Sequence, residues 1–116
     1  MCYYVSITPR IRDIESAFNA RFAFPERFKP SYVASAFTFP FLPVISNEEP
    51  SVIGFFQWGL VPSWVKDNPT ADGIRTKTLN ARSETIFVKP SFKHSVVSKK
   101  CLVLVDGFYE WRHENR

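Results

Sequence analysis

The chain has 116 residues, a length that allows one domain with a real hydrophobic core. Hydrophobic residues make up 45% of it, which excludes a disordered chain, and no segment is long and apolar enough to span a membrane. Fifteen basic and eleven acidic residues leave a net charge of +4, compatible with an anionic partner but too small to require one. No signal peptide pattern is present, so a cytoplasmic location is expected, where the distant Cys2 and Cys101 stay free thiols.

The first part of the chain predicts a strand and then a helix. Residues 2–7 are β-prone, and residues 8–9, Thr-Pro, resemble a helix N-cap followed by a proline in the first turn. A helix ending near Phe22 would turn one apolar stripe toward the core, made of Ile11, Ile14, Phe18 and Phe22.

The middle of the chain predicts an antiparallel strand pair. Residues 44–46 and 51–60 are separated by a polar turn at 47–50, Asn-Glu-Glu-Pro. Residues 32–39 fit either a strand or an extended loop. Residues 40–43, Pro-Phe-Leu-Pro, are expected to be irregular because proline lacks the N–H that a regular ladder uses.

Trp58 and Trp64 bracket a glycine and a proline in an irregular segment. Two large rings are difficult to bury completely in such a segment. The two tryptophans therefore either close the core or form an exposed aromatic shelf.

The following residues predict a loop and two short helices. Residues 67–78 are polar and contain a proline and a glycine, so a surface loop is expected. Residues 78–85 predict the entry to a short helix that ends at residues 89–90, Lys-Pro. Residues 91–98 predict a second helix, capped by its first serine.

Residues 101–112, with the sequence CLVLVDGFYEWR, are predicted to form the central strand of the fold. Apolar side chains occupy both residue parities up to Val105, a pattern typical of a strand buried on both faces. A kink or bulge is expected at Gly107, before the strand resumes through residues 108–111. Glu110 is the carboxylate among these aromatics. It is either a solvent-reaching partner of an arginine or a functional acid and base.

Several kinds of chemistry lack their motifs. The sequence has no glycine-rich phosphate loop, no CxxC and no HExxH, and His94 and His113 are not at metal-ligand spacing, so neither a metal nor a cofactor is expected. Cys2 is different, because methionine is readily removed before a small residue. Removal of Met1 would leave a 1,2-aminothiol, whose amine condenses with an aldehyde and whose thiol then closes a thiazolidine. Taken alone, Cys2 is more simply an early residue of the first strand.

Ordered blocks along the whole chain resemble the SRAP family, the SOS-response-associated peptidase domains that crosslink to abasic sites in single-stranded DNA. After Met1-Cys2, the matching blocks are WGLVPSW at 58–64, LNARSET at 79–85, KPSF at 89–92, and CLV with DGFYEW within 101–111. The resemblance implies an α+β fold with a strongly curved, barrel-like, mixed or antiparallel sheet and short peripheral helices.

The resemblance also implies roles for individual residues. Cys2 is expected to be the crosslinking residue, Asn80 to hold its N-terminus and the reacting sugar, and Glu110 to act as acid and base. Arg82 is similar to a phosphate-contacting arginine. The DNA bases would rest on a surface to which three residues are assigned: Trp64, Pro40 and Trp58. The implied partner is single-stranded DNA with abasic sites, and the implied location is the cytoplasm, at the nucleoid.

The sequence departs from the family pattern in three places. Tyr3 and Tyr4 stand where the family usually has Gly-Arg, and a phenylalanine-rich segment replaces a polar residue before Pro40. The family domain is also about twice this long, and its C-terminal half supplies a histidine that works with the glutamate. Residues 1–116 are therefore expected to be one SRAP-like domain truncated at its C-terminal side, and not to be a competent enzyme on their own. The unpaired aromatic edge at 108–112 would favour self-association.

Two other functions stay open. A freed Cys2 would be the nucleophile of an N-terminal-nucleophile thiol peptidase or amidohydrolase, which needs an oxyanion site and an αββα sandwich. A module without chemistry would instead hold single-stranded nucleic acid through its aromatic and arginine side chains. An adduct with an abasic oligonucleotide, turnover of an amide, or unmodified binding distinguishes the three.

Overall fold

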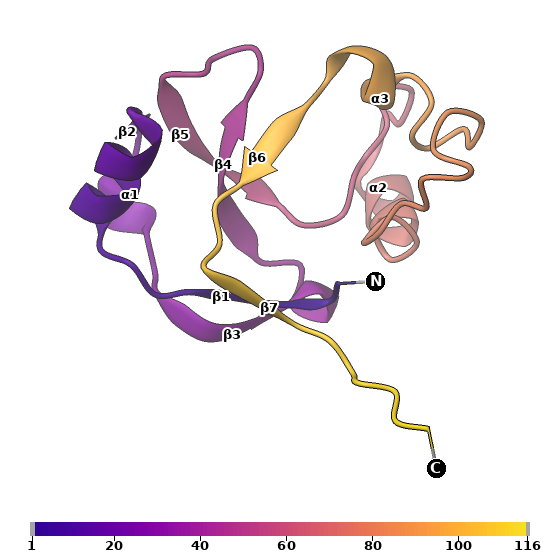
Figure 1. The fold of residues 1–116 in the computed structure, drawn as a ribbon. Coiled ribbons are helices and arrows are strands. Elements are labelled where there is room, and N and C mark those ends of the chain that lie inside the picture. Colours follow the sequence, from indigo (N-terminus) through magenta and orange to yellow (C-terminus); the bar gives the residue numbers. More distant parts are fainter. Residues whose placement is uncertain (1, 116) are drawn as a thin grey trace.

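The computed structural model describes residues 2–115 and shows an α+β fold (Figure 1). In chain order the elements are β1 (Tyr4–Ile7), α1 (Ile11–Phe18), β2 (Arg21–Phe22), η1 (Pro25–Arg27), β3 (Ser31–Ser35), η2 (Ala36–Thr38), β4 (Phe41–Ser46), β5 (Val52–Gln57), α2 (Asn68–Arg75), α3 (Ser95–Ser98), β6 (Cys101–Val103) and β7 (Gly107–Tyr109). In the part of the chain that the structure describes, no helix has the length and hydropathy needed to cross a bilayer.

The strands form two sheets. One is three-stranded with the order β3-β1-β7, and the other is four-stranded with the order β2-β5-β4-β6. All pairings are antiparallel except that of β2 with β5. In Figure 1, α1 lies on one flank of the sheets and α2 and α3 on the other. The α+β class and the peripheral short helices are confirmed, while the strands of residues 2–115 do not close into a barrel.

The stretch 101–112 is not the buried central strand that its apolar pattern predicts. It divides into β6 and β7, which lie at the ends of different sheets. Leu102 is 58% exposed in β6 and Phe108 is 66% exposed in β7, whereas Leu104 between the two strands is buried. The apolar pattern misleads because both strands are edge strands, and within residues 2–115 no strand pairs with their outer edges.

Contacts made by Asp106 explain where the strand divides. Its backbone N–H donates to the carbonyl oxygen of Ser6 at 3.0 Å, and its carboxylate accepts hydrogen bonds from the backbone N–H and the hydroxyl of Thr8. The Leu104 N–H instead donates to Pro43 in the other sheet. Leu104 and Asp106, two positions apart, are thus bound to different sheets. The division falls directly before Gly107, where the sequence predicts an interruption.

Helix α1 is shorter than the sequence predicts. It begins at Ile11 because the Thr8 hydroxyl binds Asp106 and does not cap the helix. It ends at Phe18, where Asn19 takes a left-handed conformation with φ of 48°. Phe22 lies in β2, and its N–H donates to the Glu15 carboxylate at 2.9 Å.

The predicted antiparallel pair is confirmed as β4 and β5, but β4 begins earlier than expected. Pro43 lies inside β4, opposite Phe55. Its carbonyl faces away from β5, because it accepts from the Leu104 N–H at 2.9 Å. A residue's N and carbonyl point to the same side of a strand, so the missing N–H of Pro43 removes no bond to β5. The expectation of irregular backbone is therefore wrong for residues 41–43, while Pro40 lies outside the strand.

Two apolar clusters form the core. The larger joins α1 to the four-stranded sheet and contains Ile14, Ala20, Phe22, Ile45, Ile53 and Leu104. The smaller joins the two sheets and contains Val5, Ile7 and Leu42. Cys2 and Trp58 pack against this second cluster. The core thus places the start of the chain beside the end of β5.

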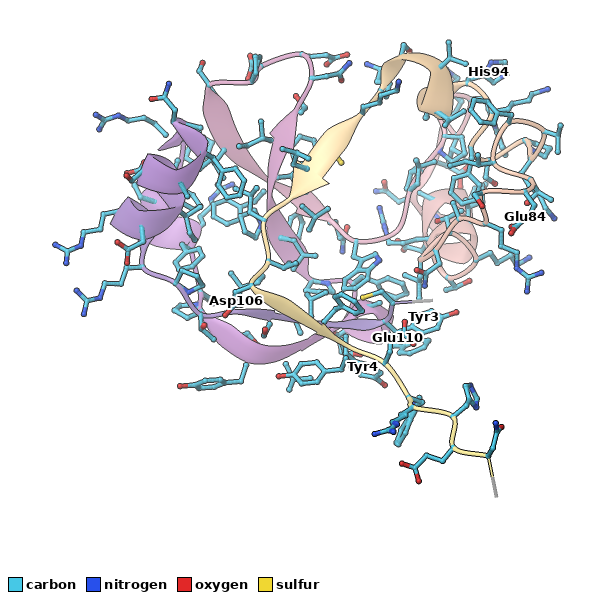
Figure 2. All side chains as sticks on the ribbon, in the orientation of Figure 1. Tyr3, Tyr4, Glu84, His94, Asp106 and Glu110 are labelled. Atoms are coloured by element: carbon cyan, nitrogen blue, oxygen red, sulfur yellow. The ribbon has the colours of Figure 1, made fainter. Side chains whose placement is uncertain are left out.

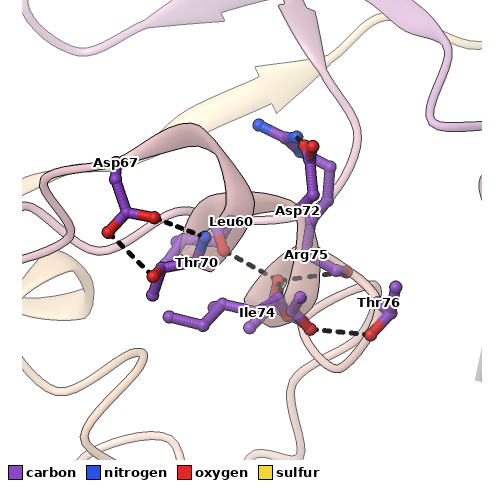
Figure 3. Close-up of polar contacts among 9 residues, drawn as sticks. Leu60, Asp67, Thr70, Asp72, Ile74, Arg75 and Thr76 are labelled. Atoms are coloured by element: carbon purple, nitrogen blue, oxygen red, sulfur yellow. Dashed lines mark hydrogen bonds and ion pairs between the residues drawn. The ribbon is translucent and has the colours of Figure 1, made fainter.

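The segment between β5 and β6 differs from the prediction twice. Residues 67–78 are not a loop but contain α2, whose N-terminus is capped by the Asp67 carboxylate through the backbone N–H and hydroxyl of Thr70 (Figure 3). The same two bonds hold the pKa of Asp67 below its usual value. Residues 83–94 form successive turns, and helix α3 covers only Ser95–Ser98.

Candidate functional site

Cys2 lies just before β1 and is half-buried. It packs against the cluster of Val5, Ile7 and Leu42, and its Sγ is 3.7 Å from the carbonyl oxygen of Tyr4. Its sulfur is a free thiol, as is that of Cys101. A thiol is therefore available at the N-terminal end of the three-stranded sheet.

Trp58 connects the surroundings of Cys2 with two other predicted site residues. Its ring packs against the same apolar cluster, its backbone N–H donates to Pro40 at 2.9 Å, and its indole Nε1 donates to the Leu79 carbonyl at 2.8 Å. Leu79 directly precedes Asn80. One half-buried indole thus contacts the cluster that supports Cys2 and binds both Pro40 and the residue before Asn80.

Asn80 carries a buried side-chain donor. Among the described residues, its Nδ2 has no hydrogen-bond partner although it is inaccessible to solvent. A buried amide donor without a partner costs roughly 1–3 kcal/mol of stability. Such a cost is typical of a site that a bound group completes.

Thr78 fixes the backbone from which Asn80 projects. Its buried hydroxyl donates to the Leu60 carbonyl at 2.7 Å, and the Leu60 N–H donates back to the Thr78 carbonyl at 3.4 Å. The dashed line from Leu60 in Figure 3 marks this bond, whose donor lies three residues after the end of α2. Sequence reasoning missed Thr78, because no motif signals a threonine that acts through a distant backbone.

Glu110 lies directly after β7, the strand that pairs with β1 next to Cys2. It directly follows Tyr109, which is paired with Tyr4 in the register of β1 and β7. Figure 2 shows Glu110 beside Tyr3 and Tyr4. Its side chain is exposed, so the apolar surroundings suggested by the sequence are not found.

Arg82 and Trp64 lie on the stretch between β5 and α3. Arg82 is exposed directly before the turns of residues 83–94, and Trp64 is 50% exposed. Residues 60–100 carry eight basic and three acidic residues, a net charge of +5, whereas the rest of the chain carries seven basic and eight acidic. The positive charge of the protein is therefore concentrated on the segment that contains Arg82.

An aromatic group beside Cys2 was also missed. The rings of Tyr3 and Phe37 are stacked, with their centroids 5.0 Å apart. The ring centroids of Tyr4 and Phe37 are 6.2 Å apart. Two tyrosines after the cysteine are visible in the sequence, but their contact with Phe37 depends on the pairing of β1 with β3.

The chain resembles proteins whose names refer to abasic sites. It is 36% identical over 113 residues to the abasic site processing protein YoqW of Bacillus subtilis, covering 97% of this chain and 48% of that protein. It is 43% identical over 65 residues to the abasic site processing protein HMCES of Xenopus tropicalis, covering 55% of this chain and 19% of that protein. The chain thus spans about half the length of YoqW.

The chain also shares its fold with a solved structure. The crystal structure of a Bacteroides thetaiotaomicron protein superposes with a TM-score of 0.86 at 35% identity, covering 97% of this chain and 50% of that one. The profile of the family described as SOS response associated peptidase (SRAP) matches residues 1–116. The protein therefore belongs to the SRAP family.

Proposed function

We propose that this protein binds single-stranded DNA and, once Met1 is removed, forms a covalent crosslink between Cys2 and the aldehyde of an abasic site, in DNA repair. The observation that carries this proposal is the buried Nδ2 of Asn80, which lacks a hydrogen-bond partner among the described residues and belongs to the residue after Leu79, the acceptor of the Trp58 indole. A donor held there without a partner is suited to a group that arrives with the DNA. The names of the relatives, abasic site processing proteins, support an abasic site as the lesion.

The reaction needs no oxidant or cofactor. An opened abasic sugar carries an aldehyde at C1′, and the Cys2 amine adds to this carbon. Loss of one water gives a Schiff base, and the Cys2 thiol then adds to the same carbon while its proton moves to the nitrogen. The product is a five-membered thiazolidine, which is more stable than the imine.

Two side chains assist these steps in the proposal. Glu110 takes a proton from the Cys2 ammonium, which frees the amine, and later returns a proton to the departing sugar oxygen. Asn80 donates to the sugar and holds the N-terminus in place. Both roles need short distances to the bound sugar, and the β1–β7 pairing and the Trp58–Leu79 bond favour such an arrangement.

The DNA strand would extend from this site over the basic segment. Arg82 would contact a phosphate through its fork of donors, while Trp64, Pro40 and Trp58 would support unpaired bases. Because Trp58 is half-buried, its contribution would come mainly through the placement of Pro40. The site of action would be the cytoplasm, at the nucleoid, where such lesions occur.

Self-association is a further part of the proposal. β6 and β7 each leave one edge without a strand partner among residues 2–115, and Trp111 is 89% exposed. Free strand edges with apolar side chains pair readily with another chain. Light scattering would show a mass above that of a monomer, and a strictly monomeric species would contradict this part.

The test of the function uses the full-length protein with its Met1 removed and an oligonucleotide carrying one abasic site. A denaturing gel should show an adduct that survives without borohydride and is absent in Cys2→Ala. Turnover of an amide substrate without an adduct would favour a thiol peptidase. Unmodified binding alone would favour a non-catalytic module.

Two variants separate chemistry from binding. Glu110→Gln should slow crosslinking with little change in affinity for undamaged strands. Arg82→Ala should weaken binding and reduce its salt slope by about one. Crosslinking by Glu110→Gln at the parent rate would reassign Glu110 as a structural carboxylate.

A further inference from the structure

Three aromatic side chains gather next to Cys2, and we name them the aromatic platform: Tyr3, Tyr4 and Phe37. The Tyr3 and Phe37 rings are nearly parallel, with an interplanar angle of 23°. Phe37 is 56% exposed and Tyr4 is 36% exposed. Rings that serve the core are covered, so the exposed faces of this platform are available to a ligand.

The backbone under Phe37 is held firmly. The Ala36 N–H donates to the Tyr3 carbonyl at 2.8 Å, and Ala36 is fully buried. The Ser35 hydroxyl accepts from the Phe37 N–H at 3.3 Å, which caps the short helix η2. The platform is thus fixed to the residue that follows Cys2.

The same segment continues directly into Pro40. Phe39 adopts a left-handed conformation with φ of 51°, which ends η2, and Pro40 follows it. The Pro40 carbonyl is bound by the Trp58 N–H. The platform is therefore continuous with the predicted DNA surface and is attached to the predicted crosslinking residue.

The chemistry of the platform indicates its ligand. Tyr3, Tyr4 and Phe37 offer flat π faces and no cationic group, so they do not suit a phosphate. An unpaired nucleobase stacks on such faces with little dependence on its sequence. A sugar bonded to Cys2 would bring the neighbouring nucleotide of the same strand close to residues 3 and 4.

We propose that the aromatic platform stacks the nucleobase directly adjacent to the abasic site. This inference rests on the proposed function, because the abasic sugar at Cys2 is what places the base. The contact is apolar, so its strength depends on the size of the flanking base and only weakly on salt. A purine, with its larger face, binds better than a pyrimidine, and a second abasic residue at that position binds worst.

The experiment measures binding without crosslinking. The full chain carrying Cys2→Ser is titrated with single strands that contain a tetrahydrofuran analogue of the abasic site. The nucleotide on its 5′ side, or on its 3′ side, is a purine, a pyrimidine or a second tetrahydrofuran. Phe37→Ala and Tyr3→Ala are compared with Phe37→Tyr, which keeps the ring. Phe18→Ala is the control, since Phe18 is an exposed aromatic on α1, on the opposite flank.

The result expected is a loss of about tenfold in affinity in Phe37→Ala when one flanking position holds a purine. That loss should vanish when the same position is abasic, and Phe37→Tyr should restore binding. Equal losses on every oligonucleotide would show that Phe37 only stabilises the fold, and would overturn the proposal. No loss on either flank would overturn it as well.

The parallel crosslinking assay keeps the two claims apart. If flank dependence is lost in Phe37→Ala while the Cys2 protein forms no adduct, the platform stands and the crosslinking function fails. If the Cys2 protein crosslinks equally well whatever base flanks the lesion, with and without Phe37, the function stands and the platform fails.

Discussion

The indole Nε1 of Trp58 donates a hydrogen bond to the carbonyl oxygen of Leu79 at 2.8 Å. This bond links the end of β5 to the residue before Asn80, across a separation of 21 residues in the sequence. Because Trp58 also packs against the cluster that supports Cys2, the bond couples the two residues proposed to meet the abasic sugar.

Thr78 is predicted to be required for the position of Asn80. Thr78→Val removes the buried hydroxyl and leaves the Leu60 carbonyl without this donor, so the free energy of unfolding should fall by about 1–2 kcal/mol. Thr78→Ser keeps the hydroxyl and should retain most of the stability. Chemical denaturation measures both. Equal stability of parent and Thr78→Val would show that the bond contributes nothing.

Asn80 is predicted to lower stability in exchange for function. Asn80→Leu removes the unpartnered Nδ2 at similar volume, so the free energy of unfolding should rise by about 1 kcal/mol while crosslinking is lost. The matched control is Asn47→Leu, because the Asn47 amide binds the Ser98 carbonyl and the Lys100 N–H. That variant should be less stable than the parent. Destabilisation by Asn80→Leu would argue that Asn80 is a structural residue.

Two glycines should respond oppositely to alanine. Gly59 has φ of 102°, and a Cβ there would lie 2.1 Å from Cγ of Arg75, so Gly59→Ala should destabilise the fold by about 2 kcal/mol or more. Gly73 lies within α2 with open space around its Cα, so Gly73→Ala should stabilise by about 0.5–1 kcal/mol. Thermal unfolding of both variants checks the pair. Equal effects of the two substitutions would contradict the geometry.

The link between Asp106 and Thr8 should depend on pH. Hydrogen bonds, chiefly from the Thr8 hydroxyl, hold the pKa of Asp106 below its usual value in the folded state. A lowered folded pKa stabilises the fold above the unfolded pKa of about 3.9, and this stabilisation is lost as pH falls through the folded value. Asp106→Asn should therefore be less stable than the parent near neutral pH, and the difference should shrink in acid. Melting temperatures measured across that range test this, and a constant difference would contradict it.

The sequence predicts elements whose signals are local. The turn at 47–50 predicts the β4–β5 pair, and the spacing of Ile11 and Ile14 predicts the buried side of α1. The division of residues 101–112 could not be predicted in the same way. It depends on Asp106 binding Ser6 and Thr8, about a hundred residues earlier in the chain.

The arrangement of the candidate site also depends on contacts that the sequence does not reveal. Motifs predict roles for Cys2, Asn80 and Glu110. The contacts made by their segments join residues that are distant in the sequence, such as Trp58 with Leu79 and Tyr4 with Tyr109. The aromatic platform has no motif, because Phe37 meets Tyr3 only through the pairing of β1 with β3.

The most direct test of the central claim is the mass and location of the adduct with an abasic single strand. Intact-mass measurement should give the mass of Met1-free protein plus that of the oligonucleotide, less one water. Peptide mapping should place the modification on Cys2, and Cys2→Ala should show none. An adduct located on a lysine, or one undiminished in Cys2→Ala, would falsify the assignment of Cys2 as the crosslinking residue.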